Sequence, residues 1–381
     1  MAWFGFRLPT KPAICLSPRI RRPNTRIWPP LADSPKDHSA YRGMLKATSA
    51  LASAKLVTIG VSIVRTKLLA LLLGPAGMGT VNVVTSSLDF ARVLFSCGMD
   101  GATVRRIAAA ASADDSEELN HAYRVSTRTA IILGASAAAV FACASPVLAE
   151  HLLGDRSLFW WFLAGGSSLV FTPLLAVQLG FLQGIKQSKS LAICQVAASL
   201  AGALLNIVLV WWFDRTGAIL SLLPVVVTSL TVHHRFVRKF RPRTSASALK
   251  NFPSEFRNLL KLGSAFAING IWLTAAGWLN IFFLTRYYGP TNAPFQIGLH
   301  GAASMLSNFY IGILISSMGT EFYPRLIGAA ADKPRLNELL NQQTRLSMAI
   351  GIPVSAGMIL AAPWILPLLY TKDFVAATEL M

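Results

Sequence analysis

Nine apolar stretches, each about as long as a membrane-crossing helix, follow one another along most of this chain. They are predicted at residues 48–72, 79–98, 126–148, 157–182, 190–212, 216–233, 262–286, 296–320 and 343–370. About 20 helical residues cross the hydrocarbon core of a bilayer, and only helices or closed barrels satisfy their own backbone groups there. The composition agrees, because 53% of residues are hydrophobic and only 14% are charged. We therefore predict an all-α polytopic membrane protein.

The positive residues between these stretches are unevenly divided between the two sides. On the side opposite to the N-terminus the predicted loops hold only Arg156, Arg215, Arg286 and Lys372, and all other Lys and Arg between stretches lie on the N-terminal side. Because Lys and Arg accumulate in cytoplasmic loops, we expect a cytoplasmic N-terminus. The same loops account for the net charge of +18, so the charge does not indicate a nucleic-acid partner.

The longest and most basic connection, residues 234–261, divides the chain into two expected lobes. Six stretches precede it in a lobe at 44–233, and three follow it in a lobe at 262–381. Residues 1–43 are rich in Arg and Pro and contain no long apolar run. We expect either a disordered basic extension there or a true start at Met44.

Three landmarks recur across the connection, in the same order and at nearly constant separation. Gly74-Pro75 recurs as Gly289-Pro290, Arg106 as Arg325, and Pro146 as Pro363, with separations of 215, 219 and 217 residues. Six intervening stretches return the chain to the same side of the membrane, so the repeat is predicted to be parallel, about an axis along the membrane normal. The second copy reaches only its third stretch, which predicts an incomplete second lobe.

Polar side chains form stripes along the first two stretches. In the first stretch they are Thr48, Lys55, Thr58, Ser62 and Arg65, and in the second Asn82, Thr85, Ser86, Asp89, Arg92 and Ser96. Steps of three, four and seven keep such residues on one helix face. Ionisable groups inside a bilayer mark functional sites by default, which favours a shared water-filled cavity. The alternative is packing, with Asp89 paired to Arg92 and hydroxyls bonded to backbone carbonyls.

The equivalent stretches of the second lobe carry no fixed charge near their middle. Their polar stripes contain Asn269, Trp272 and Asn280, then Gln296, His300, Ser304 and Ser307. The substrate-binding candidates in the two lobes are Lys55, Arg65, Asp89, Arg92, Asn269, Asn280 and His300. Their net charge is positive, and Arg and Lys suit an anionic headgroup such as a diphosphate.

The sequence contains no pattern of a catalytic or metal site. GxxxxGK[ST], GxSxG and HExxH are absent. The four cysteines, Cys15, Cys97, Cys143 and Cys194, show no CxxC spacing. We therefore expect a protein that is not an enzyme and has no cofactor or metal, and transport energy from an ion gradient, the membrane potential or consumption of the product.

Three segments carry a resemblance to a known family. They are LLALLLGPAGMG at 68–79, FLQGIKQ at 181–187 and YTKDFVAA at 370–377. In this order they resemble the Wzx-type O-antigen flippases of the MOP (multidrug/oligosaccharidyl-lipid/polysaccharide) exporter superfamily. The resemblance implies two six-helix lobes around a central cavity that works by alternating access, with only the first three helices of the second lobe present here.

The resemblance also implies a substrate and a location. The substrate is an undecaprenyl-diphosphate-linked oligosaccharide, such as an O-antigen unit of lipopolysaccharide, flipped across the bacterial inner membrane. Membrane lipids are further partners, together with a polysaccharide polymerase and chain-length proteins.

Three alternatives remain open. A drug/cation antiporter of the same fold is expected to have a carboxylate-rich cavity. A membrane polysaccharide polymerase or ligase is expected to have a large periplasmic loop with acidic and Arg residues. The third alternative is an inactive fragment.

Overall fold

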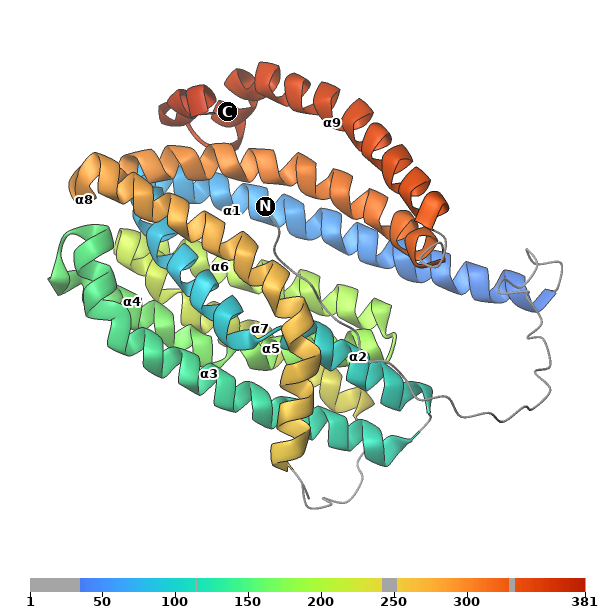
Figure 1. Cartoon of the computed structure of the whole chain (residues 1–381). Coiled ribbons are helices and arrows are strands. Elements are labelled where there is room, and N and C mark those ends of the chain that lie inside the picture. The colour runs from blue at the N-terminus through green and yellow to red at the C-terminus, as the bar shows by residue number, and fades with distance from the viewer. Residues whose placement is uncertain (1–34, 114, 242–251, 329–332, 381) are drawn as a thin grey trace, which may run out of the picture. The chain divides into compact units, whose positions relative to one another are not determined.

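A computed structural model describes residues 35–113, 115–241, 252–328 and 333–380 (Figure 1). The α-helices are α1 (Pro35–Ser96), α2 (Met99–Ser112), α3 (Ser116–Leu153), α4 (Phe159–Gly166), α5 (Thr172–Gly184), α6 (Ser188–Leu220), α7 (Leu222–Phe240), α8 (Phe252–Gly328) and α9 (Lys333–Leu369). Short 3-10 helices are η1 (Arg156–Leu158), η2 (Ser167–Val170) and η3 (Lys372–Leu380). Every element in the described ranges is helical, which confirms the all-α prediction. The described residues up to Lys46 belong to a unit separate from Ala47–Met381, and the contacts below all lie within residues 47–381.

The nine expected stretches lie in these helices, with the fourth interrupted between Gly166 and Thr172 and the sixth divided between α6 and α7 at Ser221. By length and composition, five helical segments of the described residues are able to cross a membrane: Leu51–Ser96, Ser116–Leu153, Arg156–Gly184, Ser188–Leu220 and Lys333–Leu369. Two of these segments, Leu51–Ser96 and Ser188–Leu220, each continue past a non-helical residue, Gly74 and Asp214, so each counts once although it contains two predicted stretches or parts of them. Helix α7 and helix α8, which has its own non-helical residue at Gly289, are not among the five.

Two glycines of the predicted repeat form matching interruptions. Gly74 has φ 62° and ψ −179°, and Gly289 has φ 74° and ψ 155°. Backbone with these angles is accessible almost only to glycine, because a Cβ would clash with the neighbouring peptide. Arg65 and Thr85, on the two sides of Gly74, line one cavity, so the chain folds back at this glycine.

Beyond these turns, the two copies touch in a reciprocal way. A Cβ on Gly79 would overlap the carbonyl oxygen of Pro294, and a Cβ on Gly298 would overlap the carbonyl oxygen of Pro75. The glycines are 219 residues apart, and so are the prolines. Such an exchange of equivalent contacts is what a two-fold relation between repeats produces. The separation equals that of Arg106 and Arg325, so the contacts support a repeat at this spacing, while its parallel orientation stays a prediction.

Helix α2 occupies a segment expected to be a loop. Gly98 precedes it with φ 69°, and Met99, Ala102 and Ile107 are buried on one face. These residues pack in one cluster with Phe181 of α5. Asp115 accepts hydrogen bonds from the amides of the first turn of α3, so that helix begins ten residues before the expected stretch. The prediction of a loop was wrong for this segment. Its apolar residues lie on one face of a short helix and are buried against neighbouring helices, so the segment lacks the long apolar run of a membrane span.

The expected connection at 234–261 is helical at both ends. Helix α7 continues to Phe240 and α8 begins at Phe252, while residues 242–251 lie outside the described residues. Leu259 is 1% exposed and belongs to the same cluster as Met99. The first turns of α8 are thus packed against the first lobe. At the other end of the chain, 1–34 of the expected extension lie outside the described residues, and α1 begins before Met44.

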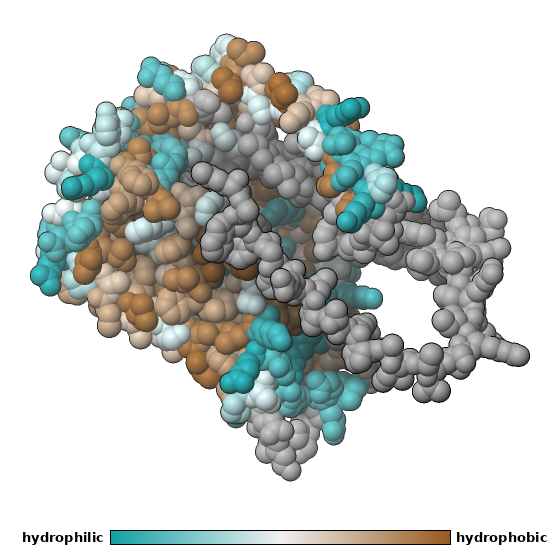
Figure 2. All heavy atoms as spheres, viewed as in Figure 1, coloured by the Kyte–Doolittle hydropathy of each residue, from teal (hydrophilic) through white to brown (hydrophobic). Residues whose placement is uncertain are grey.

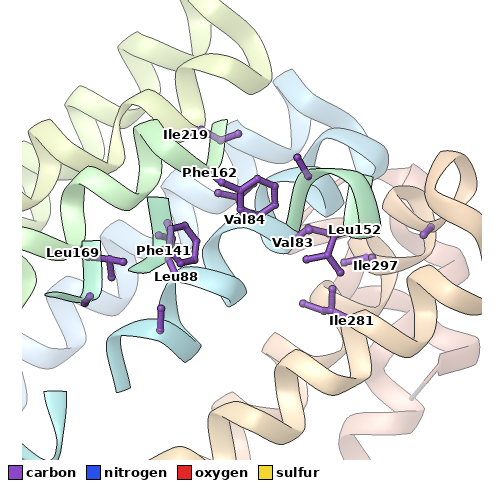
Figure 3. Packing of buried hydrophobic residues seen from close by; sticks show 14 residues of the cluster. Val83, Val84, Leu88, Phe141, Leu152, Phe162, Leu169, Ile219, Ile281 and Ile297 are labelled. Carbon is purple, nitrogen blue, oxygen red and sulfur yellow. The ribbon is translucent and has the colours of Figure 1, made fainter. Parts of the chain in front are cut away.

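A second cluster of buried apolar residues joins the lobes (Figure 3). Val84 and Leu88 of α1 pack with Phe141 of α3 and Phe162 of α4. Ile281 and Ile297 of α8 belong to the same cluster. Close packing of such buried side chains stabilises the association of membrane helices with one another.

The outer surface is apolar, as expected for contact with lipid. Figure 2 shows hydrophobic residues across the middle of the visible face and hydrophilic residues gathered near its edges. Exposed aromatic residues occur at three helix ends: Phe159 and Trp160, Trp211 and Trp212, and Tyr287 and Tyr288. By the alternation of the stretches, all three ends lie on the side opposite to the N-terminus. Aromatic residues gather at membrane–water interfaces, so these ends mark one interface.

Candidate substrate cavity

A cavity of about 350 Å³ lies within the first lobe, between α1, α5, α6 and α7. Lys55, Thr58, Ser62 and Arg65 of the predicted α1 stripe line it. The remaining polar lining comes from Gln195 and Ser199 of α6 and from Ser229 and His233 of α7. The structure therefore brings one face of α1 against two further polar helix faces.

A neighbouring cavity of about 320 Å³ lies between the two lobes. Its polar lining includes Arg65, Asn82, Thr85 and Asn206, and Gly298 and Gly301 of α8 form part of its wall. Arg65 lines both cavities. This one side chain stands where the first-lobe cavity and the interlobe cavity approach each other.

A third cavity, of about 360 Å³, lies on another side of α1 and is apolar. Ile59 and Ile63 face Met358 and Leu369 of α9 across it. Ser62 is shared with the first-lobe cavity, and Thr66 with the interlobe cavity. Three cavities thus surround a single helix: a cationic one, one that shares Arg65 with it but is otherwise lined by neutral polar and apolar groups, and an apolar one.

The first-lobe cavity is positively charged. Lys55 and Arg65 are ten residues apart, about 15 Å along the helix axis. Among the described residues that line the cavity there is no carboxylate. Three buried polar atoms near these cavities have no hydrogen-bond partner among the described residues: Arg65 Nε, Asn206 Oδ1 and His233 Nε2. Buried polar atoms are costly when unpaired, so they mark positions for polar ligand atoms or water.

Asp89 and Arg92 are placed differently from Arg65. Arg92 Nε lies 3.5 Å from Asp89 Oδ1 within the same helix. Neither residue lines any of the three cavities described above. The two charges therefore form the ion pair that the packing alternative names, and a role of either residue in substrate binding stays a prediction.

The second-lobe candidates form a group of their own. Asn280 Nδ2 lies 2.8 Å from His300 Nε2, and Ser304 Oγ lies 3.3 Å from the same nitrogen. Neither Asn280 nor His300 lines the three cavities. The side chain of Asn269 lies outside the described residues. The seven predicted residues are therefore not assembled in one place: only Lys55 and Arg65 share a cavity.

Several cavity residues were not predicted from the sequence. On α6, Gln195, Ser199, Gly202 and Asn206 follow steps of four, three and four, and on α7, Ser229 and His233 are four residues apart. Asn206 Nδ2 donates to Ser221 Oγ at 2.6 Å, which joins the two faces. The periodic signal is the same as in α1, but it consists of neutral residues, which are common in membrane helices for packing alone.

The amino-acid sequence matches the family described as "Polysaccharide biosynthesis protein" over residues 44–328. The chain belongs to this family. The family is part of the MOP superfamily, so the expected superfamily is confirmed. No curated protein sequence matches the chain.

Solved structures similar to this family member are also MOP transporters. An inward-facing multidrug resistance MATE family transporter is 16% identical, with a TM-score of 0.65 over 84% of this chain and 74% of that one. A MOP superfamily transporter from Pyrococcus furiosus is 17% identical, with a TM-score of 0.57 over 88% and 76%. The eukaryotic MATE transporter AtDTX14 is 15% identical, with a TM-score of 0.58 over 88% and 77%. At these identities the likeness shows the fold, and with the family it makes the chain a multi-pass MOP transporter.

Proposed function

We propose that this transporter flips an undecaprenyl-diphosphate-linked oligosaccharide, such as an O-antigen unit, across the bacterial inner membrane. The observation that carries the proposal is the set of three chemically different cavities around α1. A lipid-linked sugar has three parts of matching chemistry: an apolar isoprenoid, an anionic diphosphate and a polar glycan. A substrate with fewer kinds of surface would leave at least one cavity without a complementary group.

In this proposal the diphosphate binds in the first-lobe cavity. Lys55 and Arg65 supply positive charge, and the planar guanidinium of Arg65 is suited to bidentate contact with phosphate oxygens. Unpaired Arg65 Nε then gains an acceptor. Desolvated ion pairs of this type are strong only when hydrogen-bonded, which this geometry allows.

The other two parts of the substrate fit the other two cavities. Neutral polar groups of Asn82, Thr85 and Asn206 suit sugar hydroxyls in the interlobe cavity. Ile59 and Ile63 with Met358 suit the first isoprene units in the apolar cavity. Because Ser62, Arg65 and Thr66 are each shared between two cavities, one substrate molecule can occupy all three.

The charge of the cavity favours this function over drug/cation antiport. A cationic drug needs anionic or aromatic partners, and no carboxylate is among the described residues lining the three cavities. Polarity is a meaningful criterion within this fold. The similar Pyrococcus furiosus transporter is itself described as having a binding pocket of reverse polarity that suggests a different function.

The proposal also covers the orientation of the protein in the membrane and its partner proteins. The N-terminus lies in the cytoplasm, where the basic loops face anionic lipid headgroups. A polysaccharide polymerase and chain-length proteins act on the flipped product. The chain itself catalyses no covalent step and requires no cofactor.

Reconstitution of the 381-residue chain in liposomes tests the function. A fluorescent undecaprenyl-diphosphate oligosaccharide is placed in both leaflets, and a membrane-impermeant reagent then modifies the sugars that reach the outer face. We expect complete modification with the protein and about half without it. A matched lipid that carries the same sugar without phosphate should remain about half protected. Equal transport of both lipids, or transport of a lipophilic cation instead, would refute the proposal.

A further inference from the structure

His233 is a buried titratable residue whose hydrogen bonds leave one ring nitrogen free. Its residue exposure is 3%, and Nδ1 lies 2.7 Å from the backbone carbonyl oxygen of Ser229. A carbonyl oxygen only accepts hydrogen bonds, so Nδ1 carries the proton of the neutral ring. Nε2 is then a bare acceptor, buried and without a partner among the described residues.

The contacts of α6 place His233 at a defined end of the first-lobe cavity. Asn206 bonds to Ser221 at one end of the α6–α7 pair. The helices run in opposite directions from there, so Gln195 and His233 come together at the other end. Arg65 shares the interlobe cavity with Asn206. Lys55, ten residues earlier in α1, therefore lies toward the His233 end, which the loop charges assign to the cytoplasm.

The charged groups around His233 are positive or distant. From α1, Lys55 and Arg65 line its cavity. The elements α4, α5 and η2, which also contact α7, contain no titratable residue. The titratable residues of α6 are Lys189, Cys194, Asp214 and Arg215, none of which lines the cavity. On α7 itself, His234 is exposed and lies 3.5 Å from Gln178, and Arg235 is exposed.

We propose that His233 and Lys55 form a titratable anion site at the entrance of the first-lobe cavity, and that binding of the lipid diphosphate there draws a proton onto His233 Nε2. This inference rests on the proposed function. The proton comes from water at the cavity mouth and bonds to the Nε2 lone pair, so the ring becomes a cation. Nε2 is thereby converted from an acceptor, which repels phosphate oxygens, into a donor that bonds to one.

The site would act before Arg65 on the path of the headgroup. Lys55 and protonated His233 receive the diphosphate at the cytoplasmic end, and Arg65 holds it where the cavity meets the lobe interface. His233 releases its proton when the headgroup moves on. Lys55 and Arg65 remain charged throughout, so His233 is the group through which pH controls binding.

Binding of farnesyl diphosphate to the purified full chain in detergent tests this inference. Calorimetry at pH 6 and pH 8, in buffers of different ionisation heat, gives both the affinity and the number of protons taken up. An anion beside a histidine shifts its protonation about tenfold or more. We therefore expect the native chain to gain about tenfold more affinity from pH 8 to pH 6 than His233→Asn, and to take up more protons. The diphosphate titrates in the same way in the experiments with the native chain and with His233→Asn. Its contribution therefore cancels when the pH dependence of the two proteins is compared.

The variants are chosen to separate charge from packing. In His233→Asn the amide nitrogen occupies the place of Nδ1 and keeps the bond to Ser229, while Nε2 is lost. His233→Gln is the second variant if the first melts at a lower temperature than the native chain. His234→Gln, on the neighbouring exposed residue, should retain the native pH dependence.

The outcomes distinguish this inference from the proposed function. Native pH dependence and proton uptake in folded His233→Asn or His233→Gln would overturn the inference and leave the function standing. A native chain that binds no farnesyl diphosphate at either pH would overturn both. At pH 8, His233→Arg should bind farnesyl diphosphate more tightly than the native chain does, because its positive charge does not depend on proton uptake.

Discussion

The hairpins of α1 and α8 are alike in backbone and unlike in charge. Both turn at a glycine of positive φ, Gly74 and Gly289, and both touch the other copy through a glycine and a proline carbonyl. Yet α1 brings Lys55 and Arg65 to a cavity, whereas α8 pairs neutral Asn280 with His300. The repeat thus sets the scaffold, while in the proposed site the positive charges come from one copy. Equivalent substitutions in the two copies should therefore separate the contribution of the scaffold from that of the binding residues.

The largest expected difference between the copies is in transport. Arg65→Gln removes the fork of donors from the cavity, and loss of one partner of a buried charge pair costs about 2–5 kcal/mol. We expect the flipping rate in liposomes to fall by about thirtyfold or more. Asn280→Ala, in the other hairpin, should reduce it less than about threefold.

Arg65→Lys refines this expectation. It keeps a point charge but loses bidentate geometry, so its rate should lie between those of the native chain and Arg65→Gln. Similar losses in Arg65→Gln and Asn280→Ala, at equal thermal stability, would show that both copies bind substrate.

Substitutions at the two glycines of the reciprocal contacts should destabilise the protein equally. In Gly79→Ala and Gly298→Ala a new methyl group meets a carbonyl of the opposite copy, and overpacking costs about 1–3 kcal/mol. We expect both variants to lose the same stability within error, measured as the free energy of unfolding in mixed detergent. Gly60→Ala and Gly277→Ala are the matched controls, because no atom lies within 4 Å of a Cβ at either position. Unequal losses at Gly79 and Gly298 would break the two-fold relation.

The equivalence of the scaffolds was accessible from the sequence, because it depends on local backbone rules. Gly74-Pro75 and Gly289-Pro290 combine a residue that tolerates positive φ with one that begins a helix. Apolar length and loop charge likewise follow from the bilayer, which acts on every residue in the same way.

The cavity was harder to predict from the sequence, because it depends on which helix faces pack against one another. The α1 stripe was visible through its charges, but Asn206 and His233 acquire significance only when α6 and α7 close around α1. For Asp89 and Arg92 the sequence allowed both a cavity and an ion pair, and it could not show the distance between the side chains, which is 3.5 Å from Arg92 Nε to Asp89 Oδ1. Helix α2 was missed because its apolar face is too short to resemble a membrane span.

The turns themselves should show a matched effect. No atom of another segment lies within 4 Å of a Cβ at Gly74 or Gly289. The penalty in Gly74→Ala and Gly289→Ala therefore comes from the backbone alone, because its positive φ and extended ψ strain a Cβ against the adjoining peptide, at a cost of about 1–3 kcal/mol. Each variant should therefore lower the free energy of unfolding by a similar amount. A neutral result at one turn alone would mean that this turn relaxes to a conformation the other cannot adopt.

The smallest effect is expected for reversal of the Asp89–Arg92 pair. The side chains are 63% and 36% exposed, and pairs spaced in this way contribute only about 0.2–0.5 kcal/mol. Asp89→Arg combined with Arg92→Asp keeps a pair and the net charge, so flipping should stay within about twofold of the native rate. Asp89→Asn alone leaves an unpaired cation and should be the more harmful change. If the reversal instead stops flipping in a stably folded protein, one of these side chains contacts the substrate. The charged part of the second half of α1 would then belong to the site together with Asn82 and Thr85, and the site would extend beyond the cavities described above.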